Sequence, residues 1–182
     1  VYSRSKKESS SKPFGTQLDV YDVGYEWINH SINAIPFAES NHNPRVKIGS
    51  SQCTKPYESS MFNISAMSFG SLSKNAILAL NAGAKQGGFF HNTGEGGLSP
   101  YHLQEGGDVV WNIGTGYFST RTPDGKFSVE EFTKRATLDN VKMIEIKFSQ
   151  GAKPGHGGIL PKKKVTDEIA AIRLVQKGND II

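Results

Sequence analysis

The stretch that decides the fold lies at positions 62–71 and reads FNISAMSFGS. Its apolar part, Phe62 to Met67, predicts a short buried strand. The small residues that follow, among them Gly70, predict a loop, and Ser73 then stands where a helix needs an N-cap. A strand followed by a loop and a helix is the repeating unit of parallel α/β folds.

The same unit recurs along the rest of the chain. Further strands are predicted at 89–92, 109–113 and 141–148. Helices are predicted after three residues of types that cap helix N-termini, namely Ser73, Ser128 and Thr166. This alternation predicts parallel strands joined by right-handed crossovers, and therefore an α/β fold.

The first 60 residues lack this rhythm. Apolar residues between Tyr21 and Ile32 have loosely helical spacing, with Asp22 as a candidate cap. One short strand is predicted at 45–48. We therefore predict residues 1–60 as an N-terminal extension that packs on residues 61–182.

The composition excludes several classes of protein. The net charge is +4, but the basic residues are scattered, so no nucleic-acid interface is expected. The five histidines lack metal-ligand spacing, and the single cysteine, Cys53, can build no disulfide, zinc or iron–sulfur site within the chain. No metal site is therefore expected. The cysteine usage fits the reducing cytoplasm, and no apolar run approaches the roughly 20 residues that span a bilayer.

Three stretches follow predicted strand ends, where ligands bind in parallel α/β folds. The first is 65–71, where small residues would let a flat ring approach backbone groups of the kind that tune a flavin. A packed turn without a ligand is the alternative. The second, 92–97, reads NTGEGG and places Glu95 between glycines. This carboxylate can orient an amine, act as an acid or base, or gate access; the alternative is a carboxylate that faces water.

The third stretch, 147–158, reads KFSQGAKPGHGG. Lys147 lies inside the apolar strand predicted at 141–148, where a lysine is costly to bury without a partner. If it points inward, it can stabilise negative charge on a reduced flavin. Lys153 lies in a turn before Pro154 and is a candidate for holding a substrate carboxylate. The alternative is that both are surface lysines.

Together and in this order, the three stretches resemble the FMN-binding domain of glutamate synthases. The resemblance runs from about Phe62 to Arg173, and residues 1–16 are similar to the stand-alone branch of that family, which lacks the amidotransferase domain. It implies a (β/α)₈ TIM barrel. Since such a barrel needs roughly 250 residues, these 182 residues would hold about the first four β/α units.

The resemblance also implies an activity. Such enzymes reduce 2-iminoglutarate, formed from 2-oxoglutarate and ammonia, to L-glutamate by hydride transfer from FMN, a step of nitrogen metabolism. The electrons would come from ferredoxin or a pyridine-nucleotide reductase. An iron–sulfur cluster is expected only in a downstream segment. The membrane helix that this branch often carries would lie before Val1, which would place the protein at the cytoplasmic face of a membrane.

The resemblance implies roles for individual residues. The flavin would be lined by Ala66, Met67, Ser68, Gly70, Asn92, Thr93, Lys147 and Gln150. The implied catalytic residues are Lys147 at the isoalloxazine, Glu95 at the ammonia entry route, and Lys153 at the substrate carboxylate.

Two positions depart from the family pattern. Tyr117 stands where glutamate synthases usually have an arginine, for which Arg121 is a candidate substitute, and His156 stands where they usually have a glutamate. Three interpretations therefore remain: an FMN enzyme that makes glutamate, an FMN enzyme with another substrate, and a non-catalytic fragment.

Overall fold

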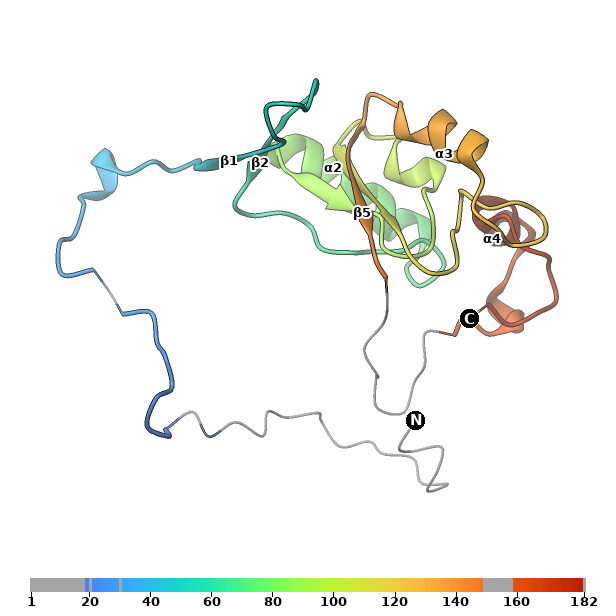
Figure 1. Cartoon of the computed structure of the whole chain (residues 1–182), viewed down its shortest axis with the longest axis horizontal. Coiled ribbons are helices and arrows are strands. Elements are labelled where there is room, and N and C mark those ends of the chain that lie inside the picture. Colours follow the sequence, from blue (N-terminus) through green and yellow to red (C-terminus); the bar gives the residue numbers. More distant parts are fainter. Residues whose placement is uncertain (1–18, 20, 30, 149–158, 182) are drawn as a thin grey trace. The chain divides into compact units, whose positions relative to one another are not determined.

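The computed structural model describes residues 19, 21–29, 31–148 and 159–181 (Figure 1). They fall into two compact units, with the first unit's main segment ending at Asn43 and the second unit beginning at Pro44. The described part of the first unit holds turns and one short 3₁₀ helix, η1 (Phe37–Glu39). The helix expected between Tyr21 and Ile32 is absent from its described residues, and the large apolar side chains there are all exposed, from 41% at Tyr25 to complete exposure at Ile28 and Ile32. A short helix gains most of its stability from packing an apolar face, and among the residues that the structure describes these side chains have no core to pack against.

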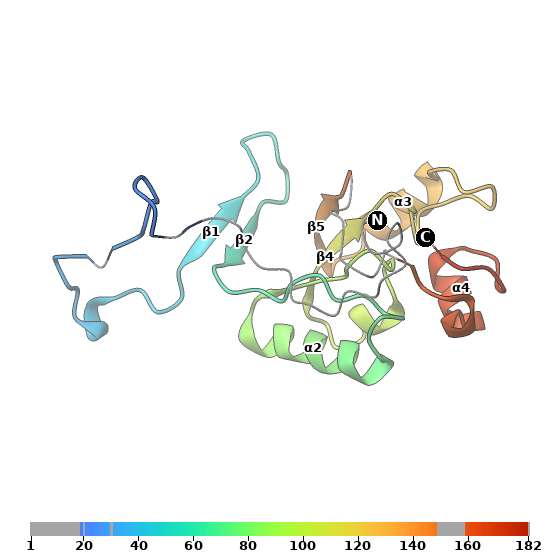
Figure 2. The same cartoon turned by 90° about the horizontal axis from the view of Figure 1, so that it is seen from below.

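The second unit has two sheets (Figures 1 and 2). In the larger sheet, three parallel strands lie in the order β3 (Phe90–Asn92), β4 (Asp108–Ile113) and β5 (Val141–Ile146). The predicted α/β class and the parallel pairing are therefore confirmed. The described residues form an open sheet and not a closed barrel.

The smaller sheet is an antiparallel pair, β1 (Arg45–Ile48) and β2 (Tyr57–Ser60). The predicted strand at 45–48 is thus confirmed, whereas β2 was not predicted. The Tyr57 hydroxyl donates to Asp108 Oδ2 at 2.9 Å, which ties this hairpin to the start of β4. This part of the predicted extension therefore contacts the α/β part. The boundary at residue 60 itself stays a prediction.

Three α-helices begin where the capping residues predicted them. They are α2 (Lys74–Gly87), α3 (Val129–Ala136) and α4 (Asp167–Arg173). In each, the hydroxyl of the N-cap accepts a hydrogen bond from the backbone N–H three residues on, which satisfies one of the free donors of the first turn. Two 3₁₀ helices, η2 (Pro100–His102) and η3 (Lys162–Lys164), lie in the connections. Across the part of the chain that the structure describes, no helix has the length and hydrophobicity to cross a membrane.

The predicted buried strand at 62–67 is wrong in extent and in burial. Ile64 forms a single parallel bridge with His91, with bonds from Ile64 N–H to Phe90 O (2.9 Å) and from Asn92 N–H to Ile64 O (3.0 Å). Phe62 is 71% exposed. The segment follows the edge of β3, and within the described residues it has a pairing partner on one side only, so the ladder stays short.

One face of the larger sheet is covered by α3. Trp111 is fully buried, and its ring stacks on Phe132 of α3 with centroids 5.8 Å apart. Because side chains alternate along a strand, residues next to Trp111 point to the other face. Asn112 therefore projects away from this helix-covered side.

Candidate functional site

A polar row crosses the carboxyl-terminal part of the three parallel strands. Glu145 of β5 accepts hydrogen bonds from Asn92 Nδ2 of β3 (Oε2, 3.1 Å) and from Asn112 Nδ2 of β4 (Oε1). Asn112 and Glu145 are also register partners, so their side chains leave the sheet on the same face. A carboxylate that accepts two amide N–H bonds is fixed in orientation, so these three side chains hold one another in place on this face of the sheet.

Lys147, two residues beyond Glu145, extends this row toward the strand ends. Its ammonium group forms an ion pair with the Glu95 carboxylate, which belongs to the loop after β3. About a third of each side chain is exposed (35% and 31%). The Lys147 backbone N–H also donates to Ile113 O at 2.9 Å, so its position is set by pairing with β4. Lys147 is therefore held at the glycine-rich loop and not in open solvent.

The loop that carries Glu95 is fixed by its first three residues. Thr93 is fully buried, and its Oγ1 accepts from the Asn112 N–H at 3.0 Å. Asn92 Oδ1 accepts from the Gly94 N–H at 2.9 Å. Gly94 has φ +64°, and a Cβ there would lie 2.9 Å from the Ser68 nitrogen. Only glycine allows the loops after β3 and after Met67 to approach this closely.

The predicted loop after Met67 lies directly against this glycine-rich loop. Met67 N–H donates to Asn92 O at 3.0 Å, and the Ser68 hydroxyl donates to Ser71 Oγ at 2.9 Å. Ala66 is exposed, while Met67, Ser68 and Gly70 are half-buried. The two loops thus pack against each other beside Lys147, with Gly94, Gly96 and Gly97 buried, and we call them together the strand-end cradle (residues 66–70 and 92–97).

A buried arginine lies against the cradle and was missed by the sequence reasoning. Arg173 of α4 is 6% exposed; its Nη2 donates to Phe69 O at 3.2 Å and lies close to Gly70 and Gly96. Its guanidinium also packs over the Phe118 ring, 5.1 Å from the centroid. Burial lowers the pKa of Arg173. No described carboxylate forms an ion pair with it. Its burial could have been predicted from its position four residues after Ile169, which places it on the apolar face of α4.

Two histidines are buried beneath the cradle. His91 and His102 are both fully buried, with ring centroids 5.1 Å apart. Burial, with a smaller contribution from His102, lowers the pKa of His91 to about 4. Burial also lowers the pKa of His102. Both rings are therefore neutral near pH 7.

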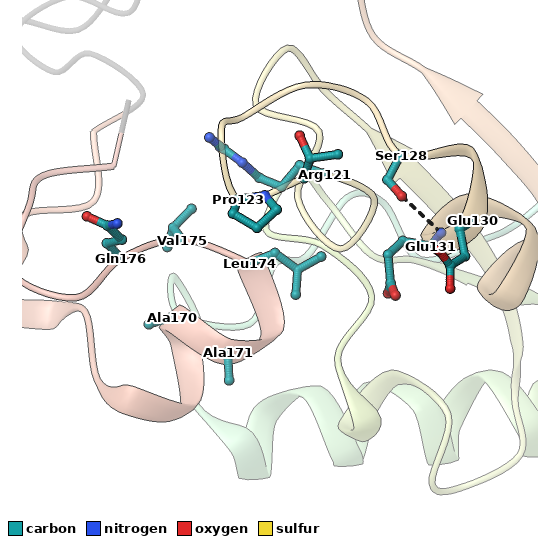
Figure 3. Close-up of a pocket in the computed structure, with 11 residues that line it drawn as sticks. Arg121, Pro123, Ser128, Glu130, Glu131, Ala170, Ala171, Leu174, Val175 and Gln176 are labelled. Carbon is teal, nitrogen blue, oxygen red and sulfur yellow. Dashed lines mark hydrogen bonds between the residues drawn. The ribbon is translucent and has the colours of Figure 1, made fainter.

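The remaining predicted residues lie elsewhere or outside the described part. Gln150, Lys153 and His156 fall in 149–158, outside the described residues. Arg121, the candidate substitute for the missing arginine, donates to Gly116 O at 3.0 Å and lines a separate cavity of about 580 Å³ (Figure 3). That cavity lies between the start of α3 and the end of α4, and none of the described residues that were predicted to line the flavin contributes to it. Tyr117 is exposed and has a positive φ of 51°.

Sequence comparison identifies the family to which the chain belongs. Residues 16–182 match the family described as a conserved region in glutamate synthase. The chain belongs to the glutamate synthase family. Members of the glutamate synthase family are oxidoreductases, and the predicted membership is confirmed.

Curated glutamate synthase relatives match most of the chain. The glutamate synthase large subunit-like protein YerD of Bacillus subtilis is 46% identical over 136 residues, 74% of this chain and 26% of YerD. An archaeal-type glutamate synthase (NADPH) of Thermotoga maritima is 42% identical over 117 residues, 64% of this chain and 20% of the relative. The archaeal glutamate synthase (NADPH) of Methanocaldococcus jannaschii is 42% identical over 120 residues, 65% of this chain and 21% of the relative. The chain thus spans about a fifth to a quarter of the length of these relatives.

Proposed function

We propose that the three parallel strands and the segment at 62–67 are part of an FMN-binding (β/α)₈ barrel, of which this chain supplies the first four units. The strands would take the first positions of the barrel, and the cradle would form part of its mouth. Family membership supports this proposal, as does the parallel order β3-β4-β5, since TIM-barrel active sites lie at the carboxyl ends of the strands.

The cradle suits a flat, electron-accepting ring. The main observation that supports the proposal is the ion pair with Glu95, which holds the Lys147 ammonium beside the glycine-rich loop. Bound FMN would supply hydride transfer. The chain's own contribution would be the backbone of Met67, Ser68 and Gly94 against the ring, and the positive charge of Lys147 near developing negative charge. Asn92 and Thr93 would hold the loop that carries Glu95.

Arg173 extends the proposal to a substrate carboxylate. A buried guanidinium is costly unless it is paired, and its observed partners within the described residues are a carbonyl and an aromatic ring. A carboxylate that reaches the cradle at Gly70 and Gly96 would complete its pairing. Together with Lys153, Arg173 would then bind the two carboxylates of 2-oxoglutarate. Glu95 would orient the incoming ammonia or imine.

The proposed reaction is the reduction of 2-iminoglutarate to L-glutamate, with electrons from ferredoxin or a pyridine-nucleotide partner. The test is performed on the full-length enzyme. It should be yellow as purified, lose its flavin absorbance near 450 nm on reduction, and regain it with 2-oxoglutarate plus ammonia but with neither alone. NADPH and reduced ferredoxin, supplied separately, should identify the electron donor. Absence of flavin in the full-length enzyme would refute the FMN proposal.

A second candidate function is an FMN enzyme on the same scaffold with another substrate. Tyr117 and the position of Arg121 in a separate cavity favour it, because neither residue supplies the arginine that is usual in the family at that position. A flavin that is reduced normally but is not reoxidised by 2-oxoglutarate and ammonia would establish this alternative.

A further inference from the structure

We infer that His102 is a positioning residue for the flavin: its ring N–H fixes the Met67 carbonyl and so holds the backbone of the cradle in place. The inference rests on the proposed FMN site. It begins from the backbone of Met67, whose N–H and carbonyl both form hydrogen bonds. Its N–H donates to Asn92 O at 3.0 Å, and its carbonyl lies 3.0 Å from His102 Nε2.

The direction of the second bond follows from the other ring nitrogen. The Ser99 backbone N–H donates to His102 Nδ1 at 3.3 Å, so Nδ1 is an acceptor. The Ser99 hydroxyl also lies 2.8 Å from Nδ1. In a neutral imidazole the proton must then be on Nε2, which donates it to the Met67 carbonyl. Ser99 therefore selects the tautomer that Met67 needs.

The surroundings of His102 make this bond rigid. His102 is fully buried at the end of η2, and the preceding Tyr101 packs edge-on against Phe69, with ring centroids 5.0 Å apart. The 3₁₀ helix therefore contacts the cradle loop at two residues: His102 lies within hydrogen-bond distance of Met67, and Tyr101 packs on Phe69. A hydrogen bond made by such a buried donor is costly to lose, because its acceptor is left without a partner.

The bond between His102 and Met67 would affect a bound flavin through the direction of the Met67 carbonyl. While His102 holds it, the Met67 carbonyl is directed into the protein interior. A freed carbonyl can turn toward the cradle, where its partial negative charge would oppose the charge of a reduced flavin held near Lys147. His102 would thus influence flavin affinity and potential without touching the ring.

The experiment compares four variants of the full-length enzyme with the wild type. H102L removes the donor, and H102N keeps a polar group that is too short to reach Met67. H102Q places an amide N–H close to the position of Nε2. The matched control, H91L, removes the neighbouring buried imidazole, whose ring nitrogens have no hydrogen-bond partner among the described residues.

The readouts are the FMN dissociation constant and the flavin midpoint potential, with thermal unfolding of the FMN-free protein measured alongside. We expect H102L and H102N to weaken FMN binding about tenfold and to lower the potential, while H102Q and H91L stay within about threefold of wild type. If H102L does not fold, H102N and H102Q decide the question.

The inference is overturned if H102N binds FMN as tightly as the wild type, or if H102Q loses as much affinity as H102N. A wild-type enzyme without FMN would instead refute the proposed function, and the inference would fall with it. FMN binding by the wild type with equal affinities in all variants refutes the role of His102 alone.

Discussion

Lys147 and Glu95 form an ion pair that joins the end of β5 to the glycine-rich loop after β3, across 52 positions of sequence. The pair places one positive and one negative side chain at the cradle, both partly exposed. Because the charges are opposite, their removal should move a bound flavin's potential in opposite directions. This opposition gives two linked predictions.

Replacement of Lys147 by methionine should make the flavin harder to reduce. The ammonium stabilises the negative charge of the reduced ring, so its loss should lower the two-electron midpoint potential by about 30 mV or more, equivalent to about 1.4 kcal/mol. Spectroelectrochemical titration of the full-length enzyme measures this shift. K147R, which keeps the charge, is the control and should shift the potential much less. An unchanged potential in K147M would place Lys147 away from the ring.

Replacement of Glu95 by glutamine should raise the same potential. The variant keeps the shape of the side chain but removes its negative charge, so Lys147 acts on the ring without opposition. We expect a rise of the order of 10–30 mV, together with slower reoxidation by 2-oxoglutarate plus ammonia. Stopped-flow absorbance follows that reoxidation. Faster reoxidation in E95Q would contradict the role of Glu95 in orienting ammonia.

Replacement of Gly94 by alanine should destabilise the chain and disrupt the cradle. Gly94 has φ +64°, and a Cβ there would lie 2.9 Å from Ser68 N. We expect a loss of at least about 2 kcal/mol in the free energy of unfolding, from backbone strain and steric conflict. The matched control is G83A in the middle of α2, where a Cβ meets nothing within 4 Å. That variant should gain about 0.5–1 kcal/mol, because alanine favours a helix more than glycine does. Urea unfolding measures both variants.

Acid should destabilise the chain through His91. Burial lowers its pKa from 6.5 to about 4 in the folded state, so between these pH values the unfolded chain binds more protons than the folded one. The free energy of unfolding should therefore be constant above about pH 6.5 and fall by up to roughly 3 kcal/mol as the pH decreases to about 4. Urea unfolding at several pH values tests this for the wild type and for H91Q. An equally steep decrease in H91Q would show that other groups cause it.

Local features of the structure were predictable from the sequence because their causes lie within a few residues. Ser73, Ser128 and Thr166 bond to N–H groups three positions away, so residue type and spacing suffice to locate the helix starts. The strand at 62–67 was overpredicted for the opposite reason. Its apolar residues fit a buried strand, but ladder length depends on neighbours that a local pattern does not report.

The candidate site was predicted in part. The cradle residues and Lys147 follow strand ends, and parallel pairing brings strand ends together, so their proximity was expected from topology. Arg173 and His102 were missed because their importance comes from burial. An arginine or a histidine in a sequence gives no sign of whether solvent or a carbonyl will surround it.

By itself, the sequence determined the order of the three parallel strands β3, β4 and β5 and of the three α-helices, the helix caps and the glycine-rich loops, since each depends on periodicity or on local hydrogen bonding. Only the tertiary structure decided that Glu145 accepts from Asn92 and Asn112, that Lys147 pairs with Glu95, and that His102 holds Met67. These contacts join residues 33 to 53 positions apart. They depend on the register of parallel strands and on the packing of η2, which arise only when distant segments share one core.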